Sequence, residues 1–482
     1  MLRIPALLLL AMPFLFVNCP KNPPSNSEYK GGVVIRDIGK DNSKDIFRPN
    51  ELIVTYKHPP SPAEAAAIKD AITAQGIAVT DVQKCNSCDS YVELWKGSGI
   101  HTTIHSEGVS GGSGGGSKGV GEDSIAHYSL NFVMSIPADS LGSLKPQQYN
   151  DKPLPFFGSR GRDTIVIAVL DTGIDTTRFV SNHYLWMNRE SKNDADDDSN
   201  CFVDDLNGWN FIENNANVHD DNGHSHGSLV TSYIVKEFER DSTKNFVQIM
   251  SLKTHDKDGF GDLFSSICAI HYAMNKGANI INASWGFYYY QDRPHPYMDS
   301  LITHIVRERG ILFVAAAGNK IDAEDALARN VYRDSSGITL TDAQLRDLRL
   351  HHFYPASLSM PDNNVLTVTT TDNGLVSPTQ NWSNQFVDLG INADHVTTSG
   401  AMQFQQPLSS TTYISGSSFA AAIATGKIGA FLPKGMYAPG VTKSAVLAKL
   451  RALIASHDIP VILFKDTRLN TAVRDGQYSK RR

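Results

Sequence analysis

The chain has 482 residues, enough for two to four domains of ordinary size. Its 44 basic and 50 acidic side chains leave a net charge of −6, which excludes the strongly basic surface of a typical nucleic-acid-binding protein. Hydrophobic residues make up 41% of the chain, so a sizeable core can form and global disorder is excluded. Five cysteines are too few for a fold held mainly by disulfides. Beyond the N-terminus no apolar run reaches 18 residues, so no internal membrane span is predicted.

Residues 1–18 predict a signal peptide, because Arg3 precedes an apolar stretch from Ile4 to Val17 with the length of a signal's hydrophobic region. The stretch ends at Asn18-Cys19 and resembles a bacterial lipoprotein signal, in which the cysteine becomes the lipidated N-terminus. That family usually has a small residue where Asn18 stands. Two interpretations are therefore open: a lipid anchor at Cys19 in the cell envelope, or ordinary secretion. Both predict export.

A polar tether is expected at 19–48, and a small α+β module at 49–140. Strand-like runs lie at 52–56, 77–82, 91–95 and 130–136, and a helical pattern spans 63–75. A Gly/Ser-rich linker occupies 107–122. Cys85 and Cys88 form a C-x2-C pair, but no second pair exists to complete a four-ligand zinc site. We expect either a local disulfide or two free thiols there.

Strands alternate with helices over 150–460. Continuous apolar runs, typical of strands buried on both faces, lie at 164–170, 246–252, 279–283, 311–317 and 365–368. Helical patterns are found at 262–277, 299–309, 417–431 and 442–456. The alternation predicts an α/β fold, with a mostly parallel sheet and helices on both faces. Residues 461–482 are expected to form a C-terminal tail.

The tripeptide Asp171-Thr172-Gly173 directly follows the run at 164–170, so its carboxylate is expected at the carboxyl edge of the sheet, where catalytic groups gather. Taken alone, it is equally typical of an aspartate in a turn. An aspartic protease needs two such carboxylates sharing a proton, and no second D-T-G or D-S-G occurs. That class is therefore excluded.

Two further candidates follow along the chain. His226 lies where a polar stretch gives way to a helical one, although most of the 16 histidines are expected to be surface residues. Ser418 opens a helix, where the dipole favours negative charge at its oxygen, although capping a helix is the commoner role of such a serine. The chain order Asp, His, Ser is that of subtilisin and differs from chymotrypsin and the α/β-hydrolases.

On these residues the chain resembles the subtilisin-like serine proteases, or subtilases, over about residues 155–460. The matching motifs are Val169-Leu170-Asp171-Thr172-Gly173, His226-Gly227-Ser228, Ala316-Ala317-Gly318-Asn319, Tyr354-Pro355-Ala356-Ser357 and Gly416-Ser417-Ser418-Phe419-Ala420-Ala421. The family commonly has other residues at five positions, where this chain has Ser228, Leu229, Ser417, Phe419 and Ala422. None of these is a catalytic group in the family. Residues 320–353 are longer than the family's usual connection, so an inserted segment is expected near the site.

The resemblance implies a serine endopeptidase that hydrolyses polypeptides through an acyl-enzyme and needs no cofactor for catalysis. It implies that Asp171 orients the imidazole, that His226 is the general base and acid, and that Ser418 is the nucleophile. Asn319, with the backbone N–H of Ser418, matches the oxyanion hole. The segment expected to pair with substrate backbone consists of Ser284, Trp285 and Gly286.

A second hypothesis from another class is a non-catalytic exported surface protein on a decayed protease fold. The four intact residues Asp171, His226, Ser418 and Asn319 argue against it. The resemblance further implies that the module at 49–140 is a propeptide, acting as an intramolecular chaperone or inhibitor and separated by processing before about residue 162. The alternative is an accessory domain that stays attached.

The segment from Glu190 to Asp221 holds ten carboxylates and one lysine. Oxygen ligands stand at alternate positions there, as in calcium loops: Asp196, Asp198, Asn200 and Asp204. Cys201 occupies the position where such loops prefer glycine. A structural calcium ion and a solvated acidic loop are both open interpretations.

Overall fold

The computed structural model describes residues 47–74, 76–86, 88, 91–100, 126–136, 162–176, 184–239, 243–288, 296–372, 375–407, 411–455 and 467–469. The predicted signal peptide and linker, with most of the predicted tether and tail, lie outside these residues, so those predictions stay untested. Among the helices of the described residues, none is long and apolar enough to cross a membrane.

A nine-stranded sheet forms the centre of the larger domain, in the order β19-β15-β13-β11-β9-β5-β7-β6 with β14 paired to β13. The strands are β5 (Asp163–Asp171), β6 (Gly208–Asn210), β7 (Asn245–Lys253), β9 (Ile280–Ala283), β11 (Leu312–Ala316), β13 (Val365–Asp372), β14 (Leu375–Val376), β15 (Leu389–Asn392) and β19 (Thr467–Leu469). All residues of β9, β11 and β13 are buried, as is typical of parallel strands that are covered on both faces. Within the described part of this sheet only β14 and β19 pair antiparallel, so the predicted fold class is confirmed.

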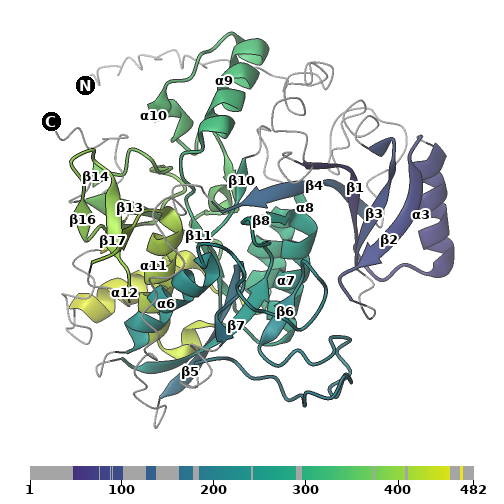
Figure 1. Cartoon of the computed structure of the whole chain (residues 1–482), viewed down its shortest axis with the longest axis horizontal. Helices are drawn as coiled ribbons and strands as arrows, with labels where there is room; N and C mark the ends of the chain where they lie inside the picture. Colours follow the sequence, from purple (N-terminus) through teal and green to yellow (C-terminus); the bar gives the residue numbers. More distant parts are fainter. Residues whose placement is uncertain are drawn as a thin grey trace, which may run out of the picture.

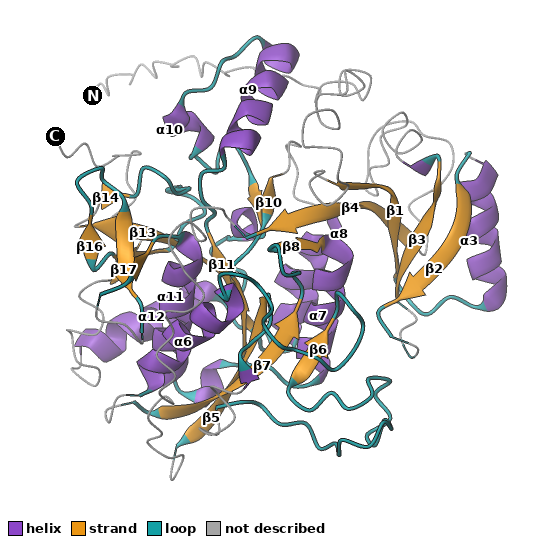
Figure 2. Cartoon of the chain, in the orientation of Figure 1, coloured by secondary structure: helices purple, strands orange, loops and turns teal. Residues whose placement is uncertain are grey.

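Helices cover both faces of this sheet (Figure 2). They are α6 (His226–Phe238), α7 (Leu263–Asn275), α8 (Pro296–Asp299) continued by the π-helix η4 (Ser300–Val306), α11 (Ser417–Phe431) and α12 (Lys443–Ala455). Side chains alternate between the faces of β5: Ile167 and Val169 belong to the apolar cluster of α6 and α11, whereas Ala168 and Leu170 belong to that of α7 and η4. Because successive side chains of a strand point to opposite faces of the sheet, the position of each residue in β5 decides which helices it contacts.

The segment expected as an insertion forms α9 (Asp322–Ser336) and α10 (Asp342–Leu345), which project from the sheet at the top of Figure 1. A buried ion pair between Asp325 and Arg346 ties them together. The ring of His351 stacks at 4.0 Å on Tyr288, which lies in the short strand β10 (Phe287–Tyr288). β10 pairs with β12 (Phe353–Tyr354), so the insertion is anchored beside the segment 284–286. A small antiparallel sheet and two 3-10 turns complete the domain: β16 (His395–Val396), β17 (Met402–Gln405), β18 (Tyr413–Ile414), η5 (Ala356–Leu358) and η6 (Lys434–Met436).

The N-terminal module has the elements predicted for it: β1 (Phe47–Tyr56), α3 (Pro62–Ala74), β2 (Ala78–Lys84), β3 (Val92–Ser98) and β4 (Ala126–Ser135). β1 begins two residues before the expected boundary. The strands form an antiparallel sheet in the order β2-β3-β1-β4-β8. Its last strand, β8 (Phe260–Asp262), belongs to the larger domain, so one sheet spans both parts of the chain.

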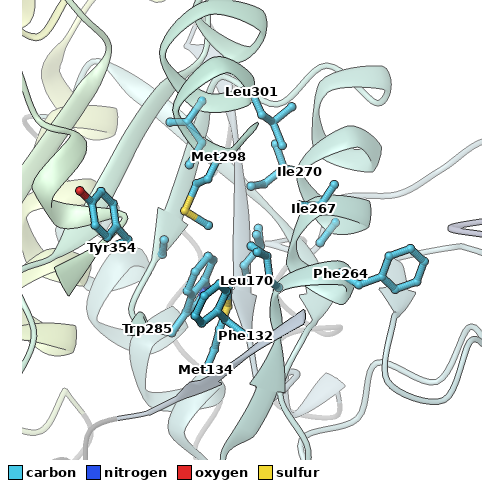
Figure 3. Close-up of a cluster of buried hydrophobic side chains, with 14 of the residues drawn as sticks. Phe132, Met134, Leu170, Phe264, Ile267, Ile270, Trp285, Met298, Leu301 and Tyr354 are labelled. Carbon is cyan, nitrogen blue, oxygen red and sulfur yellow. The ribbon is translucent and has the colours of Figure 1, made fainter. Parts of the chain in front are cut away.

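One apolar cluster likewise passes from the module into the larger domain. Phe132 and Met134 of β4 lie beside Trp285, among residues of α7 and η4 (Figure 3). The ring of Phe132 stacks on Phe287 with centroids 4.9 Å apart, and Met134 is fully buried. Each such side chain stabilises the docked state by about 1.5–3 kcal/mol through burial.

The prediction for Cys85 and Cys88 was wrong. Each forms a disulfide with the larger domain: Cys85 with Cys268 of α7, and Cys88 with Cys201 of the acidic loop, at Cα distances of 5.2 and 5.8 Å. Cys85 is buried and Cys88 is exposed, so the two side chains have different surroundings despite their short spacing. The paired cysteines are 183 and 113 residues apart in the chain, so no local sequence pattern predicts either disulfide.

Candidate active site

Asp171 and His226 lie together in the interior of the larger domain. Asp171 is the last residue of β5, and His226 is the first residue of α6. Nδ1 of His226 lies 2.7 Å from Oδ1 of Asp171, which also accepts a hydrogen bond from the backbone N–H of Thr172 at 2.8 Å. The carboxylate therefore fixes the plane of the imidazole and directs its other nitrogen, Nε2, away from Asp171.

Two glycines allow this close approach. A Cβ on Gly227 would lie 2.2 Å from the carbonyl oxygen of Gly173, so a larger residue would push the start of α6 away from the Asp171 turn. Gly173 has a φ of +111°, and its own Cβ would lie 2.6 Å from the carbonyl oxygen of Val218. The glycines of both motifs are thus explained by packing between the two backbone segments.

Ser418 is the second residue of α11 and is fully buried. Its hydroxyl donates to the backbone carbonyl of Ser284 at 3.0 Å. Nε2 of His226 is buried and has no hydrogen-bond partner among the described residues. The rings of His226 and Phe419 are 5.4 Å apart, which places the histidine against the first turn of α11. Among the described residues no hydrogen bond joins the Ser418 hydroxyl to His226.

Asn319 follows β11 and is oriented by α11. Its Oδ1 accepts from the backbone N–H of Ser417 at 3.0 Å and from the Ser417 hydroxyl at 2.9 Å. That hydroxyl also accepts from the N–H of Gly318 at 3.1 Å. With the carbonyl oxygen held on Ser417, the amide nitrogen occupies the other branch of the side chain. The structure thus brings Asn319 to the start of the helix that carries Ser418.

Asp220 was missed in the sequence, although it links the two motifs. Its Oδ1 accepts from the hydroxyl of Thr172 at 2.8 Å, and its Oδ2 accepts from the N–H and hydroxyl of Ser228 at 2.9 and 2.6 Å. The Thr172 hydroxyl in turn accepts from the N–H of Gly227 at 2.9 Å. Burial raises the pKa of Asp220, while the hydrogen bonds from Ser228 and Thr172 lower it. In the sequence Asp220 is one of ten carboxylates between residues 190 and 221, and nothing local distinguishes it from the others. The hydroxyl side chains at 172 and 228, within the two motifs, were the signal that could have indicated a shared hydrogen-bond acceptor.

His255 is a second buried histidine that the sequence did not single out. Its backbone N–H donates to the carbonyl of Asp171 at 3.2 Å, and its ring lies 6.0 Å from Trp285. Burial lowers the pKa of His255 to about 4, so the ring is neutral near pH 7. A neutral His255 ring adds no positive charge near Asp171.

The end of β4 lies between β8 and the segment 284–286. Met134 pairs with Gly261, the N–H of Ile136 donates to the carbonyl of Gly259 at 3.0 Å, and the N–H of Ser135 donates to the carbonyl of Gly286 at 3.4 Å. The segment expected to pair with substrate is thus already paired with the chain's own module. In this arrangement Asp171, His226 and Ser418 are only 1, 1 and 0% exposed.

The acidic loop brings together part of the predicted metal-ligand set. Oxygens of Asp196, Asp198 and Glu190 lie within 4.8 Å of one another. Asp204 is not in this group; its carboxylate accepts from the backbone N–H groups at 193 and 194. The amide oxygen of Asn200 likewise accepts from the N–H at 202. Oε1 of Glu190 is buried without a hydrogen-bond partner among the described residues, so carboxylate oxygens suited to a hard cation converge there.

Comparison with known proteins finds relatives of this chain. Subtilisin-like protease 1 of Plasmodium vivax is 28% identical over 262 residues, covering 52% of this chain and 38% of the relative. The protein of the same name from Plasmodium berghei is 29% identical over 214 residues, covering 43% and 32%. The chain therefore spans about a third of the length of these relatives.

Among solved structures, the epidermin leader peptide processing serine protease of Staphylococcus aureus is 17% identical, with a TM-score of 0.41 over 79% of this chain and 87% of that one. The profile of the Subtilase family (Peptidase_S8) matches residues 162–457, which include every strand from β5 to β15 and the four residues Asp171, His226, Asn319 and Ser418. The chain belongs to the subtilase family.

Proposed function

We propose that this chain is a serine endopeptidase in which Asp171, His226 and Ser418 form the catalytic triad and Asn319 contributes to the oxyanion hole. The 2.7 Å hydrogen bond between Asp171 and His226 carries the proposal, because it orients a buried imidazole whose ring lies against the first turn of α11, the helix whose second residue is the candidate nucleophile. The names of the Plasmodium relatives support the same class of activity.

Rotation of the Ser418 side chain would move its hydroxyl from the Ser284 carbonyl to Nε2 of His226. Hydrogen bonds between catalytic groups often form only when substrate is bound, so their absence here is compatible with the proposal. The Ser284 carbonyl then becomes available to the backbone N–H of a bound peptide. Substrate binding and formation of the Ser418–His226 hydrogen bond are thereby coupled.

In the proposed reaction Oγ of Ser418 attacks the scissile carbonyl carbon, and its proton passes to Nε2 of His226. The carbonyl oxygen becomes an oxyanion, which the Asn319 amide and the Ser418 N–H stabilise. Collapse breaks the C–N bond, and His226 returns the proton to the departing amine. Water then attacks the carbonyl carbon of the acyl-enzyme and gives a proton to His226. The ester C–O bond to Ser418 breaks, His226 returns the proton to Oγ of Ser418, and the carboxylic acid product leaves. Asp171 stabilises the imidazolium in both halves of the reaction.

We further propose that the N-terminal module is a propeptide that acts as inhibitor and folding template. Its strand β4 takes the hydrogen bonds of the segment 284–286 and β8 that a substrate backbone would take. A substrate could pair there only after β4 leaves, so the described state is a latent one under this proposal. We expect processing between the module and about residue 162.

A structural calcium ion remains part of the proposal, with Glu190, Asp196 and Asp198 as its carboxylate ligands. Bound calcium would offset the repulsion among these carboxylates and order the acidic loop, without a role in the chemical step. Export is also retained: two disulfides among the described cysteines are expected in an oxidising compartment. A lipid at Cys19 is expected if the signal is of the lipoprotein type.

Labelling with an organophosphonate serine probe tests the central proposal. After release of the module, we expect the wild-type chain to be labelled and to cleave peptides. Ser418→Ala should remain folded but lose labelling and at least about 10⁴-fold in turnover. Ser444→Ala, a serine exposed on α12, is the matched control and should behave as wild type. No labelling of the released wild-type domain would favour the non-catalytic alternative, and labelling of Ser418→Ala would refute the assignment.

A further inference from the structure

The N-terminal module and the protease domain are joined by two disulfides as well as by the chain. All four cysteines that the structure describes are used, and each bridge has one cysteine in the module and one in the protease domain. The peptide connection between the two parts runs from Ile136, after β4, to Arg162, before β5. Hydrolysis of any bond in that connection therefore leaves the two parts covalently linked.

The two bridges differ in their access to solvent. Cys88 is exposed and Cys201 is partly exposed, at the surface of the acidic loop. Cys85 and Cys268 are only 5% and 2% exposed, inside the apolar cluster that spans module and protease domain. A disulfide is opened by in-line attack of a thiolate on sulfur, so access controls the rate. The Cys88–Cys201 bridge should therefore be opened first and the Cys85–Cys268 bridge second.

We propose that the Cys88–Cys201 bridge is a thiol–disulfide exchange site for a dithiol reductant, and that the two bridges retain the module on the protease after the connecting chain is cut. This inference rests on the proposed function for its consequence, the control of peptidase activity. Each bridge opens through a mixed disulfide. The dithiol gives up two electrons and becomes a disulfide, while the protein disulfide gains two electrons and two protons and becomes two thiols.

Retention has a quantitative consequence. A module held by a short tether is present at an effective concentration on the order of millimolar, so β4 rebinds between β8 and the segment 284–286 much faster than a free module at micromolar concentration. Cutting the connection alone therefore leaves the site covered. Activation becomes a two-signal process, in which cleavage breaks the peptide connection and reduction releases the module.

The tether is tested without relying on catalysis. Full-length Ser418→Ala, with the recognition sequence of a site-specific viral protease inserted within 141–160, is cut by that protease and run on a denaturing gel. We expect the two fragments to migrate together without reductant and apart with dithiothreitol. Peptide mass mapping should find the pairs 85–268 and 88–201. Fragments that separate without reductant, or a Cys85–Cys88 peptide, would overturn the proposal.

The order of opening and the effect on activity need two further measurements. Alkylation during native treatment with dithiothreitol should label Cys88 and Cys201 at least tenfold faster than Cys85 and Cys268; equal rates would refute the exchange site.

In the cut wild-type chain, peptide turnover should rise at least tenfold on reduction, and in the Cys85→Ser/Cys88→Ser variant it should need no reductant. Full turnover of the cut, oxidised wild-type chain would overturn the control of activity. A chain that never turns over peptide would contradict the proposed function and leave the tether result intact.

Discussion

Two helices show how differently the two parts of this chain are stabilised. All fifteen residues of α11 are buried in the protease domain, whereas α3 of the module buries a single residue, Ile72. The protease domain has a parallel sheet covered by helices on both faces (Figure 2). The module has four strands of its own and obtains a fifth from the domain on which it docks. A small sheet with one largely exposed helix buries much of its apolar surface only through that docking.

The difference teaches where control of this protein resides. The geometry of the candidate triad depends on backbone contacts inside the protease domain, such as the approach of Gly227 to Gly173. Coverage of the site depends instead on β4, whose apolar side chains insert into the protease domain (Figure 3). Activity and latency can therefore be changed independently, by substitutions in different regions.

The largest expected effect comes from removing the aromatic contact between the two parts. Phe132→Ala should destabilise the docked module by about 3–5 kcal/mol, because it deletes a buried ring that stacks on Phe287. Two measurements report this loss: the free energy of unfolding from chemical denaturation, and the rate at which a protease digests the module. Val82→Ala, at a 39% exposed position of β2, is the matched control and should change stability by less than about 0.5 kcal/mol. Equal losses in both variants would show that the module is stable without docking.

Asn319→Leu changes the protease domain and leaves docking of the module intact, so it tests catalysis separately from latency. An oxyanion donor meets charge that exists only in the transition state, so kcat should fall about 10²–10³-fold while KM stays nearly unchanged. That magnitude comes from subtilisin and not from this chain. Steady-state kinetics of the released domain provide the measurement. A raised KM with normal kcat would make Asn319 a turn residue alone.

Acid should weaken the protease domain through His255. Burial lowers the pKa of His255 to about 4, from about 6.5 in the unfolded chain, so the unfolded chain takes up a proton first as the pH falls. The stability that the neutral histidine contributes is complete above pH 6.5 and is lost between pH 6.5 and 4, by up to about 3 kcal/mol. His255→Asn should flatten this part of the curve of unfolding free energy against pH. An unchanged slope would assign the acid sensitivity to other groups.

The sequence predicted most of the protease fold because long apolar runs and glycine stops are local signals. β5, β7 and α11 lie within a residue of their expected bounds, and the motifs led to Asp171 and His226 before their 2.7 Å contact was known. Long-range pairings had no local signal. The partners of Cys85 and Cys88, the sharing of β8 with the module and the antiparallel strand β19 all join segments far apart in the chain. Asp220 was missed for the same reason, since its role appears only when residues 172 and 228 meet.

The smallest expected effect concerns the acidic loop, which lies on the protease side of the exposed disulfide. If calcium is held by Glu190, Asp196 and Asp198, chelation should lower the melting temperature, since an ion that binds only the folded state stabilises it by about 1.4 kcal/mol at ten times its Kd. Asp196→Asn should remove the response to chelator. Asp204→Asn should keep it, because that carboxylate lies outside the cluster of Glu190, Asp196 and Asp198. A melting temperature that ignores the chelator in the wild-type chain would establish a solvated loop, ordered from its surface by the Cys88–Cys201 bridge.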